Sequence, residues 1–346
     1  MSNILKIPNA HGRLHFFGYG FGHPSEFVKK EEKVFADGRT TQKEYSKRDD
    51  IVFYDGNCAL FQDGTTLAWI IGGYSNTNPG EIPCRKTEIV PAPKEAEAIV
   101  QIASGWSHFI ALCEDGRVVC WGTDDAKKQT KVPSNLKDVV AVSASKNASH
   151  ALTKNGEVVS WGDKSDTTHP KNLKDIVQIS GSIGLSSNGK VVPWGLDDFG
   201  EVCYPPQPKL PKIRSLTRTS SGFDGRSAAA VITVDGKLKS IGVRPERLDQ
   251  AMGNVRSKIK KASIAMGVFE CDGAFVLFEN GIAEYFHFED LKEDKSGDTY
   301  DANSRNPGHY LNLIDDSYRV DSKKYANVID LGIAPDCDGL WVLVRE

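Results

Sequence analysis

Short runs of alternating apolar and polar residues recur along most of this chain with one shared layout. Residues 99–122 (IVQIASGWSHFIALCEDGRVVCWG) contain two apolar runs, the pair Asp115-Gly116, a third run and a closing Trp-Gly, and residues 139–162 repeat that order. Alternation with a period of two, as in RVVCWG and EVVSWG, is typical of half-buried strands and not of helices. An Asp-Gly or Asn-Gly pair suits a tight hairpin turn, since both residues tolerate a positive φ. The pattern therefore predicts repeated units of short strands.

A fixed spacing between two glycines marks the repeat along the chain. Gly116 precedes Gly122 by six residues, and the same step occurs in 156–162, 189–195 and 236–242. Units at 51–72 and 261–287 keep the alternation and the turn pair, although the second lacks the closing glycine. Residues 328–346 look like the opening strands of a further unit, and residues 11–18 supply its missing last strand. Joined, the two ends of the chain make a seventh unit.

Such units cannot bury both of their faces alone, so they must stack radially, and the ring must close to hide its edges. We therefore predict an all-β protein: a seven-bladed β-propeller over residues 1–346, with the N-terminal strand completing the C-terminal blade. Three segments exceed the usual length of a connection between strands. Residues 23–50, 73–98 and 288–326 are expected to be long loop insertions within this single domain.

The repeat resembles a known family. Residues 99–122 match the regulator of chromosome condensation repeat almost position by position, through Gly105, His108, Ala111, Leu112, Asp115, Gly116, Trp121 and Gly122. WGLDDFGEV at 194–202 resembles the segment that follows the tryptophan in this family, and the Trp-Asp ending of WD40 blades is absent. The resemblance implies a stand-alone propeller that binds proteins. Relatives are partners of a small zinc protein, of an oxygenase or of a β-lactamase, and the founding member exchanges guanine nucleotide on a small GTPase.

Composition narrows the class of function. Lys and Arg (43) nearly balance Asp and Glu (46), so no bulk field draws the protein to nucleic acid or to anionic lipid. The seven cysteines include no C-x-x-C pair, which argues against a disulfide framework or a zinc knuckle. No apolar run has the length of a signal peptide or a membrane span. We expect a monomer or a member of a heterocomplex in the reducing cytoplasm or nucleus, without a metal or cofactor.

Most residues that could carry chemistry have a structural explanation. Trp121, Trp161 and Trp194 end third strands and should pack between blades. His108 occupies the repeat's histidine position, where a packing role is expected, and His150 is expected at the surface or in the partial core. The glycines of FGYGFG lack the following helix and the Gly-Lys-Ser/Thr ending of a phosphate loop. No catalytic motif is recognised, so we predict no catalytic residue.

The candidate partner-binding residues lie in connections. Trp106 falls in a turn between strands, where an exposed aromatic would favour an interface. Acidic pairs follow Trp-Gly in equivalent loops, and the longest insertion combines Tyr, Arg and His. The candidates are Trp106, Asp124, Asp125, Asp197, Asp198, Phe199, Tyr300, Arg305, His309 and Tyr310. Loop shaping is the alternative explanation for the aspartates, and a solvated insertion is the alternative for residues 288–326.

Three functional hypotheses remain open at this point. The first is a non-catalytic adaptor that holds a partner protein on one loop face. The second is a guanine-nucleotide exchange factor, although the wedge sequence of the exchange factors is not recognisable here. The third is a secreted or injected inhibitor, and the missing signal peptide argues against ordinary secretion.

Overall fold

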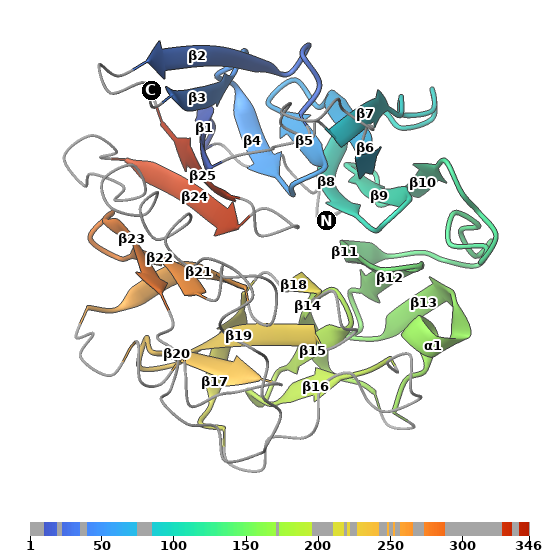
Figure 1. Ribbon diagram of the computed structural model, residues 1–346. Helices are drawn as coiled ribbons and strands as arrows, with labels where there is room; N and C mark the ends of the chain where they lie inside the picture. Colours follow the sequence, from blue (N-terminus) through green and yellow to red (C-terminus); the bar gives the residue numbers. More distant parts are fainter. Residues whose placement is uncertain are drawn as a thin grey trace, which may run out of the picture.

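The computed structural model describes residues 10–18, 23–34, 40–74, 85–170, 173–195, 210–217, 220–221, 227–241, 248, 252, 257–265, 273–287, 327–333 and 339–345. Within these ranges the strands form seven antiparallel sheets, which follow one another in chain order around a ring (Figure 1). The predicted all-β propeller is confirmed. That the whole chain is one domain stays a prediction.

Each sheet collects strands that are neighbours in the sequence, except at the closure of the ring. The first sheets contain β4 (Ile51–Tyr54), β5 (Cys58–Phe61), β6 (Thr66–Tyr74) and β7 (Arg85–Ile89); β8 (Ile99–Ser104), β9 (His108–Cys113) and β10 (Val118–Gly122); and β11 (Val139–Ser145), β12 (Ala148–Thr153) and β13 (Val158–Gly162). They are followed by β14 (Ile176–Ser180), β15 (Ile183–Ser186) and β16 (Val191–Pro193); β17 (Ile213–Leu216), β18 (Ser220–Ser221), β19 (Ser227–Thr233) and β20 (Leu238–Ile241); and β21 (Ile259–Ala265), β22 (Gly273–Phe278) and β23 (Ala283–His287).

The two ends of the chain close the ring in one sheet. β1 (Arg13–Gly18) pairs with β25 (Gly339–Val344) from Arg13↔Val344 to Gly18↔Gly339, and β25 pairs in turn with β24 (Val328–Ile333). In Figure 1 the blue β1 therefore lies beside the red β25. The prediction that the N-terminal strand completes the C-terminal blade is confirmed.

The expectation that residues 23–50 form a loop is wrong. They contain a hairpin of β2 (Val28–Val34) and β3 (Thr40–Ser46), and β3 pairs with β1 through His15↔Tyr45 and Phe16↔Glu44. Residues 73–98 likewise contain β7, which pairs with β6. The hairpin was missed because VKKEEKV places charged residues at consecutive positions, which hides any apolar alternation. The third predicted insertion, 288–326, lies outside the described residues.

In three blades the Asp-Gly or Asn-Gly turn between the second and third strands is hydrogen-bonded to the next blade. Gly156, Gly189 and Gly236 have φ values of +78°, +83° and +85°. Their carbonyl oxygens accept hydrogen bonds from the backbone N–H groups that open the following blade, at Ile176 (3.0 Å), Ile213 (3.1 Å) and Ile259 (2.9 Å). These turns lie at one end of the sheets, which we call the turn face. The opposite end, where first and second strands connect and Trp106 lies, is the Trp106 face.

The core lies between neighbouring sheets. One cluster joins Ile110 and Leu112 of β9 to Val139 and Val142 of β11, across the gap between two blades. Trp121, Trp161 and Trp194 are 7%, 8% and 1% exposed, so the prediction that they are buried is confirmed. Burying such large apolar surfaces between sheets is what stabilises radial stacking.

His150 was expected at the surface or in the partial core, and the surface alternative is wrong because its side chain is fully buried. Its Nε2 lies 3.0 Å from Ser145 Oγ and its Nδ1 lies 2.6 Å from Ser160 Oγ, which in turn is 2.7 Å from His169 Nε2. Burial lowers the pKa of His150 to about 3, so the ring is neutral at pH 7. The serine hydroxyls make its burial tolerable, because both ring nitrogens have a polar partner.

Candidate functional site

The site built around Trp106 begins with an exposed ring on a rigid turn. Trp106 lies between β8 and β9 and is 57% exposed, the one aromatic among the large exposed apolar residues of the described ranges. Its backbone N–H donates to the carbonyl oxygen of Lys146 in the equivalent turn of the next blade, at 3.0 Å. The Lys146 ammonium lies 4.3 Å from the centroid of the indole, within range of a cation–π interaction. The ring is therefore held in one place on its blade without being covered.

A close contact beneath this turn explains why a glycine precedes the tryptophan. A Cβ atom at Gly105 would lie 2.2 Å from Cε1 of His108 and 2.6 Å from the Ser145 carbonyl oxygen, so no larger residue fits. His108 is fully buried, and burial lowers its pKa to about 4, so it is a neutral ring that packs under the turn. This environment agrees with the packing role expected for His108.

The acidic loop after β10 uses its carboxylates mainly for its own shape. Asp124 Oδ1 accepts the backbone N–H of Ala126 at 2.8 Å. Asp125 Oδ1 accepts both the N–H (3.0 Å) and the hydroxyl (2.7 Å) of Thr130, while its Oδ2 pairs with Lys131 at 3.4 Å. These hydrogen bonds support the alternative explanation for the two aspartates, namely that they shape the loop. Asp124 nevertheless remains exposed beside Trp106's blade.

Neighbouring loops on this face interlock across the gap between blades. Lys127 forms a 2.9 Å ion pair with Asp163, which caps the short helix α1 (Lys164–Thr167) by accepting the N–H of Ser165. Asp166 of that helix accepts the N–H of Asn147 at 2.9 Å, next to Lys146. The Trp106 face between β8 and α1 is thus one connected platform and not a set of independent loops.

The remaining predicted site residues cannot be placed on this platform. Asp197, Asp198, Phe199, Tyr300, Arg305, His309 and Tyr310 lie outside the described residues. Of the ten candidates, the structure places three, and it brings Trp106 together with the 124–130 loop on one face.

Lys146 was missed by reasoning from sequence, although the repeat register contained the signal. Trp106 and Lys146 occupy the same position in successive units, and equivalent turns of adjacent blades must be neighbours in a ring. Aligning the units would have placed a cation beside the exposed indole.

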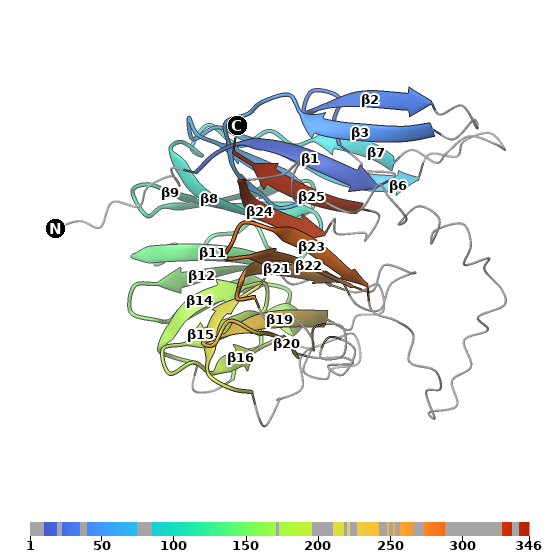
Figure 2. The ribbon, with the colours of Figure 1, turned by 90° about the vertical axis from the view of Figure 1, so that its left-hand side faces the viewer.

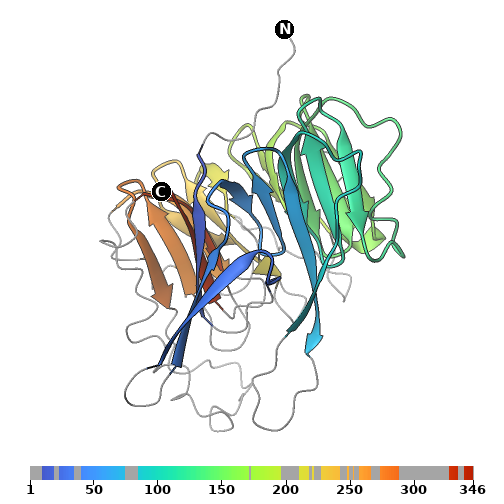
Figure 3. The ribbon, with the colours of Figure 1, turned by 90° about the horizontal axis from the view of Figure 1, so that it is seen from above.

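A second feature that the sequence did not reveal is the polar anchor of the β2–β3 hairpin. His23 Nδ1 lies 3.1 Å from Glu44 Oε2, and His23 Nε2 lies 2.8 Å from the Tyr54 hydroxyl of β4. Burial lowers the pKa of His23. Burial by itself would raise the pKa of Glu44, but hydrogen bonds from His23 and Lys30 hold it below its usual value. The anchor ties the hairpin to the ring, and Figure 2 and Figure 3 show the blue β2 and β3 projecting from the ring on the same side as β6.

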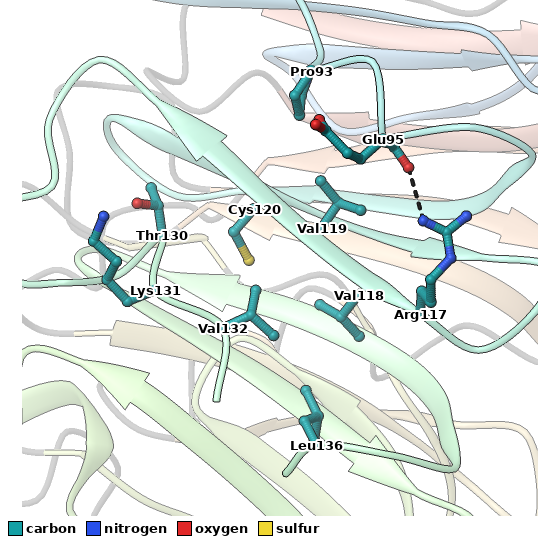
Figure 4. A pocket seen from close by; sticks show the side chains of 10 residues that line it. All are labelled: Pro93, Glu95, Arg117, Val118, Val119, Cys120, Thr130, Lys131, Val132 and Leu136. Carbon is teal, nitrogen blue, oxygen red and sulfur yellow. Dashed lines mark hydrogen bonds between the residues drawn. The ribbon is translucent and has the colours of Figure 1, made fainter. Parts of the chain in front are cut away.

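A shallow groove of about 580 Å³ lies on the outer rim, over strand β10 (Figure 4). Its floor is apolar, with Val118, Val119 and Val132, while Arg117 at its edge donates to the Glu95 carbonyl oxygen at 3.1 Å. Burial raises the pKa of Cys120 in this groove to about 12, so its thiol is not a nucleophile at neutral pH. Trp106 does not line this groove, and the lining residues form no constellation of reactive groups.

The described residues contain neither a helix that could span a membrane nor a metal-binding cluster. No described helix is long and apolar enough to span a bilayer. No group of three or more His, Cys, Asp or Glu side chains within the described ranges is arranged to hold a metal ion.

Comparison with known proteins agrees with the repeat and with the ring. The family profile described as "Regulator of chromosome condensation (RCC1) repeat" matches residues 99–126. Guanine nucleotide exchange factor SRM1 of Saccharomyces cerevisiae is 29% identical over 210 residues, which cover 54% of this chain and 37% of SRM1. RCC1 domain-containing protein RUG3, mitochondrial, of Arabidopsis thaliana is 33% identical over 92 residues, covering 23% of this chain and 21% of RUG3. The matched stretches span well under half of either relative.

A solved structure resembles the chain over nearly its full length. The crystal structure of human WBSCR16 covers 97% of this chain and 100% of its own, with a TM-score of 0.52 and 14% sequence identity. At that identity the likeness shows the fold alone. The repeated layout, the ring of antiparallel sheets and these matches together show that this chain is an RCC1-like propeller.

Proposed function

We propose that this propeller is a non-catalytic adaptor that binds a partner protein on its Trp106 face. The observation that carries the proposal is the exposed Trp106 indole, held by its backbone bond to Lys146 and by the Lys146 ammonium. A large aromatic side chain that is already held in place loses little conformational entropy on binding, which is the usual character of an interface hot spot. Cytoplasm or nucleus is the compartment in which we expect the complex.

The interlocked loops around Trp106 support the same proposal. The Lys127–Asp163 ion pair and the Asp166–Asn147 hydrogen bond keep neighbouring turns in a fixed arrangement. A partner therefore meets a preorganised surface and does not have to order it, which favours affinity. Asp124 is exposed on this platform and supplies a negative charge there.

The test is affinity capture of the stoichiometric partner, followed by calorimetry with the purified pair. Replacing Trp106 by Ala should weaken binding by about 2 kcal/mol or more, which is the range of hot-spot truncations. Val140→Ala is the control, since Val140 is 40% exposed on the opposite face. Equal affinity of Trp106→Ala and wild type, with unchanged melting, would show that the partner binds elsewhere.

Guanine-nucleotide exchange on a small GTPase is the second candidate, favoured by the similarity to SRM1. An exchange factor accelerates release of labelled nucleotide at substoichiometric amounts, whereas an adaptor leaves the rate unchanged. Release assays over a panel of purified GTPases separate the two functions. Acceleration by wild type that is lost in Trp106→Ala would move the proposal from adaptor to exchange factor on the same face.

A further inference from the structure

The turn face carries a set of lysines that form no ion pair with another described residue. Five exposed lysines at the ends of the β14–β16, β17–β20 and β21–β23 sheets have no ion pair among the described residues; they are Lys174, Lys190, Lys212, Lys258 and Lys260. We call the described residues at the turn-face ends of these three sheets, which include Val177, Val234 and Ile282, the basic arc. The three sheets are adjacent in the ring, running from yellow-green to orange in Figure 1.

Backbone hydrogen bonds make the basic arc one continuous surface. Val234 donates to the carbonyl oxygen of Lys212 at 3.0 Å, and Glu279 donates to that of Lys258 at 2.9 Å. The bonds from Ile213 to Gly189 and from Ile259 to Gly236 join one sheet to the next. The lysines are therefore carried on linked backbone, although they are far apart in the sequence.

The described carboxylates do not neutralise the arc. Glu279 is occupied by Arg214 at 3.2 Å, and Asp235 lies 3.5 Å from Lys237. Asp175 is the exposed carboxylate of the arc that has no ion pair among the described residues. Among the described residues the arc thus keeps a clear positive excess, while the whole chain has a formal charge of −3.

Apolar side chains are exposed between these lysines. Val177, Val234 and Ile282 are 58%, 64% and 39% exposed, and Val140 in the adjoining blade is 40% exposed. Together with Trp106 they are the large apolar residues exposed in the described ranges, so all but one of that group lie on the turn face. Aliphatic groups interleaved with cations favour a ligand that has both anionic and apolar groups.

We propose that the basic arc is a second interaction surface, which binds an acidic protein segment that also carries apolar side chains. A nucleic acid fits the arc less well, because phosphates gain nothing from exposed valine and isoleucine and because no aromatic residue is exposed in the described part of the arc for base stacking. The Arg214 guanidinium is also engaged, with Glu279 and with the Ile259 carbonyl oxygen.

The arc and Trp106 lie at opposite ends of the sheets, so both surfaces can be occupied at once. A protein that holds one partner on each face would bring two proteins together on a single ring. The inference about the arc does not depend on the Trp106 proposal, since it uses different residues on the other face.

The probe is a fluorescein-labelled peptide of about twelve residues, roughly 40 Å when extended, in which Glu and Asp alternate with Leu and Val. Fluorescence anisotropy with the full chain at about 0.15 M salt keeps surface charges screened to a realistic extent. A second peptide replaces Leu and Val by Ser and Gly, and a duplex of about 20 base pairs is the third probe. The acidic–apolar peptide should bind at least about tenfold more tightly than either of the other probes.

Charge reversal locates the binding. Lys212→Glu with Lys258→Glu should weaken binding of the acidic–apolar peptide about tenfold or more. The matched control is Lys94→Glu with Lys137→Glu, which changes the net charge by the same amount at two exposed lysines on the turn-face side of the β8–β10 and β11–β13 sheets. The control pair should change affinity by less than about twofold.

Each other outcome overturns the proposal. Equal losses in the two charge-reversal pairs would mean that only net charge attracts the peptide. Equal affinity of the two peptides would remove the role of Val177, Val234 and Ile282, and tighter binding of the duplex would assign the arc to nucleic acid. Absence of binding at millimolar peptide would leave the arc as a solvated surface. Circular dichroism of every variant shows beforehand that the ring is folded.

Discussion

Closure of the ring by a strand from each end of the chain predicts a strong energetic coupling between two leucines. Leu14 of β1 and Leu343 of β25 are Cα partners across the closing pair, and both are fully buried in the same cluster as Trp341. Replacing either by Ala removes buried methyl groups and leaves a cavity, which costs about 2–5 kcal/mol in well-packed cores. That is a large fraction of the roughly 5–15 kcal/mol by which native proteins are stable.

The coupling distinguishes closure from ordinary burial. Because the two side chains pack against each other, the loss in the double variant should fall short of the sum of the single losses by about 0.5–3 kcal/mol. Leu14→Ala with Leu136→Ala is the control cycle, since Leu136 packs in a different cluster and is only partly buried. That pair should be additive within about 0.5 kcal/mol.

The assay is urea unfolding followed by far-ultraviolet circular dichroism and by tryptophan fluorescence. If the clasp holds the whole ring, both signals should shift together, because the edges that it hides would otherwise be unpaired. If the double variant does not fold, Leu→Val replacements, at about 0.8 kcal/mol per methylene, keep the cycle measurable. A Leu14→Ala midpoint equal to wild type, or full additivity with Leu343→Ala, would refute the role of the clasp.

Three other outcomes are expected. Gly236→Ala should lower the stability more than Gly281→Ala. Both glycines have a φ near +84°, so either alanine is strained by roughly 1–2 kcal/mol, but only at Gly236 does the added Cβ atom meet another residue, Lys258 at 3.0 Å. Equal melting temperatures of the two variants would contradict this. Gln101→Leu should destabilise by about 1–3 kcal/mol, since the amide both donates to the Val142 carbonyl (3.1 Å) and accepts from its N–H (3.0 Å); an unchanged urea midpoint would contradict the clamp between blades. In the folded protein His108 and His150 have pKa values of about 4 and about 3, below the unfolded value of 6.5. The unfolded chain therefore binds more protons, and the free energy of unfolding should fall as the pH drops from about 6.5 toward 4. The loss should be about 1.4 kcal/mol per pH unit for each histidine that titrates independently. Urea midpoints at pH 7 and pH 5 measure that slope, and a His108→Gln variant with an undiminished slope would contradict the assignment.

Parts of the candidate site could be read from the sequence, and others could not. Exposure of Trp106 followed from its place between two apolar strands, and burial of Trp121 followed from its place at the end of a third strand. The burial of His150 could not be predicted, because this residue lies off the register of the repeat histidine. The repeat also gives no information about the serine hydroxyls that are polar partners of its ring nitrogens. His23 and Glu44 meet only because the hairpin folds back onto the closing sheet, a pairing between segments with no shared pattern.

The sequence by itself determined the strands, the turns and the closed ring, because alternation, glycine-dependent turns and unpaired edges are local requirements that repeat in register. Only the tertiary structure decided which side chains share a surface. Trp106 meets Lys146, and Lys174, Lys212 and Lys258 form one arc, because radial stacking places equivalent positions of successive blades side by side. The place of the charged β2–β3 hairpin likewise depends on the strand edge available to it in the folded ring. Its own residues show no apolar alternation from which the pairing could be predicted.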